Sequence, residues 1–279
     1  MTAVVLATVC AVVYGTADFF GGLATRRSRV LAVVVLSQTA GLVMVVALLP
    51  FLPGTPTIKT LAWGMAAGVS GSVALVLFYR ALATGVMSVV APLTATASAI
   101  LPVLFGLATG ERPEPVALGG VVLALLAVLL VSRGSSPAAT AGRSYGSVLT
   151  SLAAGAGFGG FFILISQAPE GGGIWPLFGA RLASITLIAL LALFTGRTLR
   201  PGPGACHIIV VAGALDMIAN VLFVFAQQRG LLSLVAVLVS LYPASTLLLA
   251  RYVLGERLNT VQVVGIGFTL AAVALIAAS

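Results

Sequence analysis

The tripeptide Gly110-Glu111-Arg112 returns at Gly255-Glu256-Arg257, an offset of 145 residues (255 minus 110) in a chain of 279 residues. Self-similarity at a fixed period indicates an internal repeat. Because the offset is close to half of the length, we predict that the chain is a duplication. The same offset superposes further identical residues, namely Phe78 on Phe223, Ala81 on Ala226, Gly85 on Gly230, Ser88 on Ser233 and Gly120 on Gly265.

The composition is that of a membrane protein. The chain is 60% hydrophobic and 7% charged, whereas an average soluble domain holds about 25% charged residues. A soluble fold of this size has too little interior for so much apolar surface, but lipid tails are as apolar as the side chains that face them. We therefore expect the lipid bilayer as a partner and a multi-pass protein of the bacterial cytoplasmic (inner) membrane.

Charge and cysteine content argue against several other classes. The net charge is +8, yet the arginines are scattered singly among apolar runs, so we expect no nucleic acid partner and attribute the charge to loops at an anionic membrane surface. Cys10, Cys206 and the single histidine, His207, form no metal-ligand spacing, so we expect no metal and no cofactor. Neither a nucleotide-binding loop nor a nucleophile with a base is present, so we expect no enzyme.

Hydrophobic windows between Arg, Pro, Gly and Glu clusters predict ten membrane spans of about 20 residues each. The longest polar stretch predicts a connecting loop at 135–144, between a first five-helix repeat at 1–134 and a second at 145–279. Because five crossings are an odd number, the second copy must enter from the opposite side of the membrane. We therefore predict an all-α polytopic membrane protein of two inverted five-helix repeats, with the substrate site between them. The spans are 3–23, 30–50, 60–82, 86–108, 115–132, 147–167, 174–195, 206–227, 231–250 and 259–278.

These features resemble one known family. In each half Gly-Glu-Arg closes the fourth span, and the next span opens with Gly119-Gly120 or Gly265-x-Gly267. The chain resembles the EamA-type transporters of the drug/metabolite transporter superfamily in these motifs, in its ten spans and in its duplicated half. The resemblance implies a carrier whose fifth and tenth helices flank the transport core.

We predict an exporter or exchanger of a small organic metabolite, an amino acid-like compound or a drug, working by alternating access and driven by protons or by exchange. An uncoupled facilitator or importer is the alternative, and a membrane receptor, a scaffold or an intramembrane enzyme is more remote. A monomer and a homodimer are both compatible with the sequence.

Orientation follows from the positive residues. Counting the loops between spans from the N-terminus, ten of these residues flank odd-numbered loops and three flank even-numbered loops. Positive residues favour the cytoplasm, so this count favours both termini outside it. Members of the family are usually drawn with both termini inside. The ten are Arg26, Arg27, Arg29, Arg80, Arg133, Arg143, Arg197, Arg200, Arg251 and Arg257, and the three are Lys59, Arg112 and Arg229.

Three ionisable residues lie within spans, where each costs about 2.5–3.5 kcal/mol to insert. Arg181 and Asp216 fall at similar depths of neighbouring spans, so we predict an ion pair between them. This pair either orders the second half or is broken by a substrate or proton during transport. It has no copy in the first half, where Gln38 aligns with Arg181 and Gly71 with Asp216, and this asymmetry favours a function.

Asp216 begins a polar stripe on one helix face with Asn220, Phe223 and Gln227. Such a stripe is typical either of a cavity for an organic molecule or of hydrogen bonding between helices. Pro92 and Pro102 in the fourth span and Pro243 in the ninth are predicted to kink or break their helices beside the site. Tyr242, next to Pro243, is a further candidate.

Asp18 falls toward the end of the first span, one helical turn after Tyr14, which shares its face. We expect it on the other side of the midplane from Arg181, so the two residues should not pair directly. Asp18 either reaches the membrane interface or carries a proton within the site. For the motif residues Gly110, Glu111, Arg112, Gly255, Glu256 and Arg257 we expect a structural role, in which each glutamate caps the following helix and pairs with its neighbouring arginine.

Overall fold

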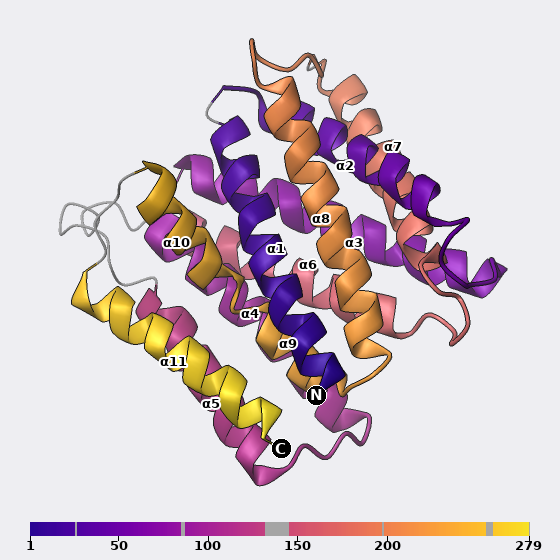
Figure 1. Cartoon of the computed structure of the whole chain (residues 1–279). Helices are drawn as coiled ribbons and strands as arrows, with labels where there is room; N and C mark the ends of the chain where they lie inside the picture. The colour runs from indigo at the N-terminus through magenta and orange to yellow at the C-terminus, as the bar shows by residue number, and fades with distance from the viewer. Residues whose placement is uncertain (26, 85–86, 132–144, 197, 255–258, 279) are drawn as a thin grey trace.

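The protein is described by a computed structural model that covers residues 1–25, 27–84, 87–131, 145–196, 198–254 and 259–278. All regular secondary structure in these residues is helical (Figure 1). The helices are α1 (Thr2–Thr25), α2 (Val30–Leu48), α3 (Ile58–Thr84), α4 (Met87–Ala108), α5 (Pro115–Val131), α6 (Tyr145–Ser166), α7 (Trp175–Phe194), α8 (Cys206–Gln227), α9 (Leu232–Val239), α10 (Tyr242–Leu254) and α11 (Thr260–Ala277).

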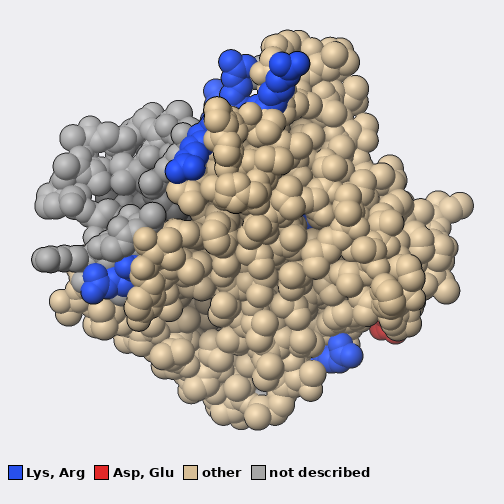
Figure 2. Space-filling model, turned by 45° about the horizontal axis from the view of Figure 1, so that its top comes forward, with Lys and Arg blue, Asp and Glu red and all other residues tan. Residues whose placement is uncertain are grey.

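The helices match a polytopic membrane protein. Eight segments of the described chain are long and apolar enough to cross a membrane by length and composition, and two shorter apolar helices, Leu93–Ala108 and Pro115–Leu130, accompany them. Figure 2 shows basic side chains at the ends of the molecule and a wide, nearly uncharged surface between them. The predicted all-α polytopic class is therefore confirmed.

The ninth predicted span is not one helix. It divides into α9 and α10, which are separated by Ser240 and Leu241 just before Pro243. Proline lacks an N–H group, and its ring clashes with the carbonyl group four residues earlier, so a continuous helix cannot pass through this position without distortion. The two prolines of the fourth span, Pro92 and Pro102, lie within α4, which runs unbroken from Met87 to Ala108. The ninth span is therefore broken, as predicted, whereas the fourth is continuous and a kink at its prolines stays a prediction.

The two halves of the chain interleave. Each of the most extensively packed helix pairs joins a helix before residue 132 to one after residue 144. These pairs are α1 with α8, α3 with α6, α5 with α11, α3 with α7 and α4 with α6. Figure 1 shows α5 and α11 lying side by side along one edge of the bundle. The interior between the halves is therefore built by both of them.

Two contacts between loops fix the ends of the bundle. At one end, the hydroxyl of Ser28 accepts a 2.8 Å hydrogen bond from the Gly202 amide, so the α1–α2 and α7–α8 connections meet. At the other end, the Thr55 amide donates to the Gly171 carbonyl at 2.9 Å, so the α2–α3 and α6–α7 connections meet. Figure 1 shows both termini of the chain at this second end.

Candidate functional site

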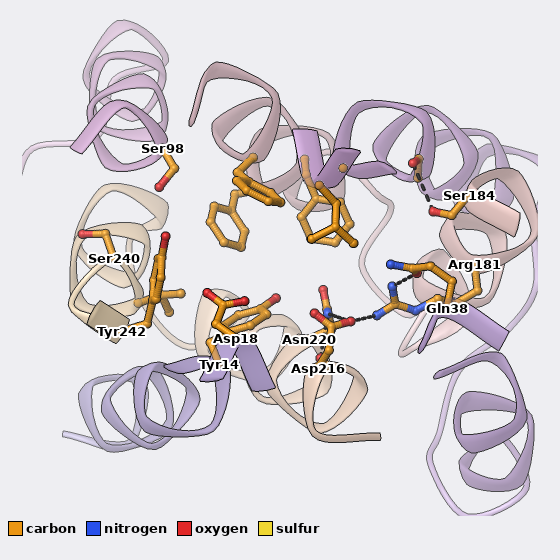
Figure 3. Close-up of a pocket in the computed structure, with 17 residues that line it drawn as sticks. Tyr14, Asp18, Gln38, Ser98, Arg181, Ser184, Asp216, Asn220, Ser240 and Tyr242 are labelled. Carbon is orange, nitrogen blue, oxygen red and sulfur yellow. Dashed lines mark hydrogen bonds and ion pairs between the residues drawn. The ribbon is translucent and has the colours of Figure 1, made fainter. Parts of the chain in front are cut away.

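A cavity of about 90 Å³ lies between the two halves (Figure 3). It takes side chains from both halves, and seven of the eight site residues predicted from the sequence line it. The exception is Gln227, at the last turn of α8. The lining residues are Tyr14, Asp18, Gln38, Gly68, Gly71, Leu75, Ser98, Phe158, Phe161, Phe162, Arg181, Ser184, Asp216, Asn220, Val239, Ser240 and Tyr242.

The predicted ion pair is present. Arg181 Nη2 lies 2.6 Å from Asp216 Oδ2, with the arginine side chain 6% and the aspartate side chain 35% exposed. The other terminal nitrogen, Nη1, donates to the Oε1 atom of Gln38. The positions that the repeat aligns, 38 and 181, therefore face each other where α2 packs on α7. Two acceptors from two helices hold the guanidinium in one orientation.

Glycines place Arg181 at this point. A Cβ atom on Gly41 would lie 3.1 Å from Arg181 Nε, so the absence of a side chain at residue 41 gives the guanidinium room beside α2. A Cβ atom on Gly68 would overlap the Ala180 carbonyl oxygen, so the same reasoning applies to α3. The hydroxyl of Ser184, one turn further along α7, donates to the Gly68 carbonyl at 3.1 Å. Small residues thus bring three helices together around one charged group.

The polar stripe of α8 divides between the cavity and the core. Asn220 Nδ2 donates to the Asp216 carbonyl at 2.7 Å and approaches Asp216 Oδ2 at 3.3 Å. Asn220 Oδ1 is buried and accepts no hydrogen bond. Phe223 is fully buried and packs its ring 4.5 Å from that of Phe162, between ring centroids. Only the Asp216 and Asn220 part of the stripe reaches the cavity, because the following turn of α8 faces aromatic residues of α6.

Asp18 is one of the residues that line the cavity. Figure 3 shows its carboxyl group beside Tyr14 and Tyr242, across the floor of the cavity from Asn220 and Asp216. Among the described residues, no hydrogen bond or ion pair joins its carboxylate to another side chain. The ion pair of Arg181 is with Asp216, and Asp18 lines the same cavity. The cavity therefore holds two different environments, one ion-paired and one with a solitary carboxyl group.

The sequence reading missed the serine and phenylalanine residues of the cavity. Phe161 and Phe162 carried a signal, since Gly157-x-x-x-Phe161-Phe162 matches Gly15-x-x-x-Phe19-Phe20 of the first half at an offset of 142 residues (161 minus 19), yet only the α6 pair lines the cavity. The serines, for which the sequence offered no distinguishing pattern, are Ser98, Ser184 and Ser240.

Glu111 does not cap the helix that follows it. Its Oε1 accepts from the Leu232 amide at 2.7 Å and its Oε2 from the Ser233 amide at 3.0 Å, so it caps α9 of the other half. Gly110 turns the chain with φ of 97°, and a Cβ atom on Gly106 would overlap the carboxylate. The free N–H groups and positive dipole end of α9 attract the charge.

The expected pairing of this glutamate with the neighbouring arginine is also not found, since among the described residues no ion pair links Glu111 to Arg112. The second copy of the motif, Gly255-Glu256-Arg257, lies outside the described residues.

Comparison with known proteins identifies the family and the fold. The sequence model of the EamA-like transporter family matches residues 1–133 and, separately, residues 146–278. One crystal structure is similar to the chain with a TM-score of 0.77 and 18% sequence identity, covering 98% of this chain and 95% of its own, which shows a shared fold. A search of curated proteins finds no match.

Proposed function

The chain belongs to the EamA-like transporter family, and from that premise we propose that it is a secondary active transporter of a small organic solute. The solute occupies the central cavity, to which the two sides of a bacterial cytoplasmic membrane gain access in turn, and the protein works as an exporter or exchanger. Ten crossings arranged as two inverted repeats, 1–134 and 145–279, joined at 135–144, provide the moving parts.

The packing of the helices supports the repeat. Exchange of the halves turns α1 into α6, α2 into α7, α3 into α8, α4 into α9 and α10, and α5 into α11. Under this exchange the α1–α8 pair becomes the α6–α3 pair, the α2–α8 pair becomes α7–α3, and the α2–α7 and α5–α11 pairs map onto themselves. A two-fold relation between the halves accounts for this correspondence.

The loop contacts support an inverted relation. The same exchange turns the contact between the α1–α2 and α7–α8 connections into the contact between the α6–α7 and α2–α3 connections. These two contacts lie at opposite ends of the bundle. An axis that exchanges the ends must run across the bundle, in the plane of the membrane, as in many secondary carriers.

The single observation that carries the proposal is that Asp18, Arg181 and Asp216 line one cavity between the halves. Each is costly within a membrane, and carriers with inverted repeats bind their solutes at the junction of the repeats. We assign Asp18 to proton coupling because its carboxyl group is not committed to an ion pair. The Arg181–Asp216 pair opens or shifts as the solute enters.

Transport in liposomes that contain only this protein tests the proposal. A ligand-stabilisation screen of metabolites and drugs supplies the solute, and its flux is measured with and without a pH gradient. We expect accumulation driven by the gradient. Accumulation without proton dependence would favour exchange, and mere equilibration would favour a facilitator. Absence of flux for every solute that stabilises the protein would reject the carrier.

The variant Asp18→Asn tests whether Asp18 couples transport to protons, because it removes the titratable group and keeps the shape of the side chain. We expect this variant to lose accumulation driven by the pH gradient while it retains exchange of solute for solute at a saturating solute concentration, because the amide is close in shape to the carboxyl group and carries no titratable proton. Glu170→Gln, which removes an exposed carboxylate in the α6–α7 loop, is the matched control and should retain both activities. Unchanged proton dependence in Asp18→Asn would exclude the coupling role.

A further inference from the structure

The charges of the cavity do not balance. It holds two carboxylates, Asp18 and Asp216, and one guanidinium, that of Arg181. Arg181 is bonded to Asp216, so the charge of Asp18 is left without a cation among the described residues. A carboxylate in an apolar site requires either a proton or a cation beside it. Building on the proposed function, we propose that the solute is an organic cation whose N–H groups bind between Asp18 and Asn220.

Asn220 supplies the second acceptor. Its Nδ2 atom bonds to the carbonyl oxygen of Asp216, which can only accept a hydrogen bond, so the amide group must have its NH₂ on that side. The Oδ1 atom is thereby turned the other way, and Figure 3 shows it directed into the cavity. It is unpartnered in a residue only 3% exposed. A buried acceptor without a donor is costly, and an ammonium group removes this cost.

The serines add acceptors and no donors. The hydroxyl groups of Ser98 and Ser240 donate within their own helical segments, to Ala95 O at 2.9 Å and Val237 O at 2.7 Å. Ser184 donates to Gly68 O on α3. A hydroxyl whose proton is engaged can offer only lone pairs to a ligand. These three hydroxyl groups therefore favour a ligand that donates hydrogen bonds to them.

The charge of Arg181 is already balanced by the carboxylate of Asp216. Both terminal nitrogens of Arg181 bond to Gln38 and Asp216. Its Nε atom has no partner, but it faces Gly41 of α2, 3.1 Å from the position of a Cβ atom there. An anionic or zwitterionic solute would bring a third carboxylate to a cavity that holds two carboxylates and one guanidinium. An amine without a carboxyl group leaves the pair intact.

The walls suit an apolar substituent on the amine. Phe158, Phe161 and Phe162 of α6 line the cavity, and the Tyr14 ring stands edge-on to Phe162 with the centroids 6.4 Å apart. Aromatic rings stabilise a neighbouring cation and cover the apolar part of a ligand. The solute class is thus an ammonium ion that bears an aromatic or aliphatic group.

Four probes with one phenylethyl skeleton test the charge that the cavity selects. They are 2-phenylethylamine as the cation, 2-phenylethanol as the neutral compound, 3-phenylpropionate as the anion and phenylalanine as the zwitterion. Binding is measured by titration calorimetry at neutral pH on the protein in lipid nanodiscs, with empty nanodiscs subtracted to remove partition into lipid. We expect saturable binding of the amine and weaker or no binding of the other three.

Variants then locate the ammonium group. Asp18→Asn and Asn220→Ala should each weaken binding of 2-phenylethylamine by about tenfold or more, the effect of one hydrogen bond to a charged group. Glu170→Gln is the control and should bind as the parent does. Equal or tighter binding of any of the other three probes, no saturable binding of the amine, or unchanged affinity in Asp18→Asn would overturn the assignment. Amine binding without flux would leave this inference standing and count against the carrier.

Discussion

Arg181 has a side chain that is held in one orientation by two neighbouring residues. Its side chain is 6% exposed and bonded to both Gln38 and Asp216, so removal of either charge leaves the other without its partner. We expect Arg181→Ala and Asp216→Ala each to destabilise the protein by up to about 3 kcal/mol, the lower part of the range for broken buried pairs, because Asp216 is partly exposed to the cavity. The double variant should lose less than the sum of the two.

Thermal unfolding of the four proteins in the same detergent measures this coupling as a double-mutant cycle. Serine replacement of Cys206, which is exposed and far along α8 from the pair, is a suitable control and should leave the unfolding midpoint unchanged. Additive effects of the two alanine variants would show that the ion pair contributes nothing to stability.

The sequence predicted this pair because charges within apolar spans are rare and because spans joined by a short loop pack together. It could not place Gln227 correctly, since helical periodicity gives the face of a residue and not its depth along the cavity. It also missed Ser98 and Ser184, whose hydroxyl groups are indistinguishable in sequence from those that only bond to their own helix.

At the scale of helices, Glu111 holds the start of α9 from the opposite half of the chain. We expect Glu111→Gln to weaken this cap by about 1 kcal/mol, since loss of a capping side chain costs about 0.5–2 kcal/mol and the amide retains one acceptor oxygen. Hydrogen exchange followed by mass spectrometry should show faster exchange in the peptide that covers 232–238 and unchanged exchange in the middle of α8.

Glu114→Gln, at an exposed position just before α5, is the matched control for this measurement. Faster exchange at the start of α5 in Glu111→Gln, with α9 unaffected, would instead mean that the glutamate caps the helix that follows it.

Helix bounds were accessible from the sequence, but helix partners were not. The predicted range 206–227 coincides with α8, because apolar windows and their flanking loops are local features. The partner of Glu111 depends on a contact over 121 residues, which no local pattern reports. Similarly, Pro243 predicted a distortion, but the division into α9 and α10 at Ser240 and Leu241 appears only in the folded chain.

For the whole molecule, duplication explains how an asymmetric site can arise on a nearly symmetric framework. Gln38 and Arg181 occupy aligned positions and meet where α2 packs on α7. Two identical chains would place the same residue at both positions, and two arginines there would repel each other. Fusion into one chain removes this restriction, so one half can carry the cation and the other its neutral acceptor.

Orientation in the membrane is the remaining property of the whole molecule, and the loops at the two ends of the bundle predict it. The end where α8 begins holds Arg27, Arg29, Arg80, Arg200 and Arg251, whereas the end that holds both termini has Lys59, Arg112 and Arg229. Because the flanking positive residues favour the first end, we expect this end in the cytoplasm and both termini outside.

Cysteine labelling in intact cells tests this orientation. Cys206 is exposed at the first residue of α8, and Cys10 is buried. A membrane-impermeant maleimide should therefore leave the parent protein unlabelled until the cells are permeabilised. In a Cys206→Ala background, Glu170→Cys, in the exposed α6–α7 loop at the opposite end, should react in intact cells. Labelling of Cys206 in intact cells, with residue 170 protected, would place both termini in the cytoplasm and show that the arginine distribution does not set the orientation of this carrier.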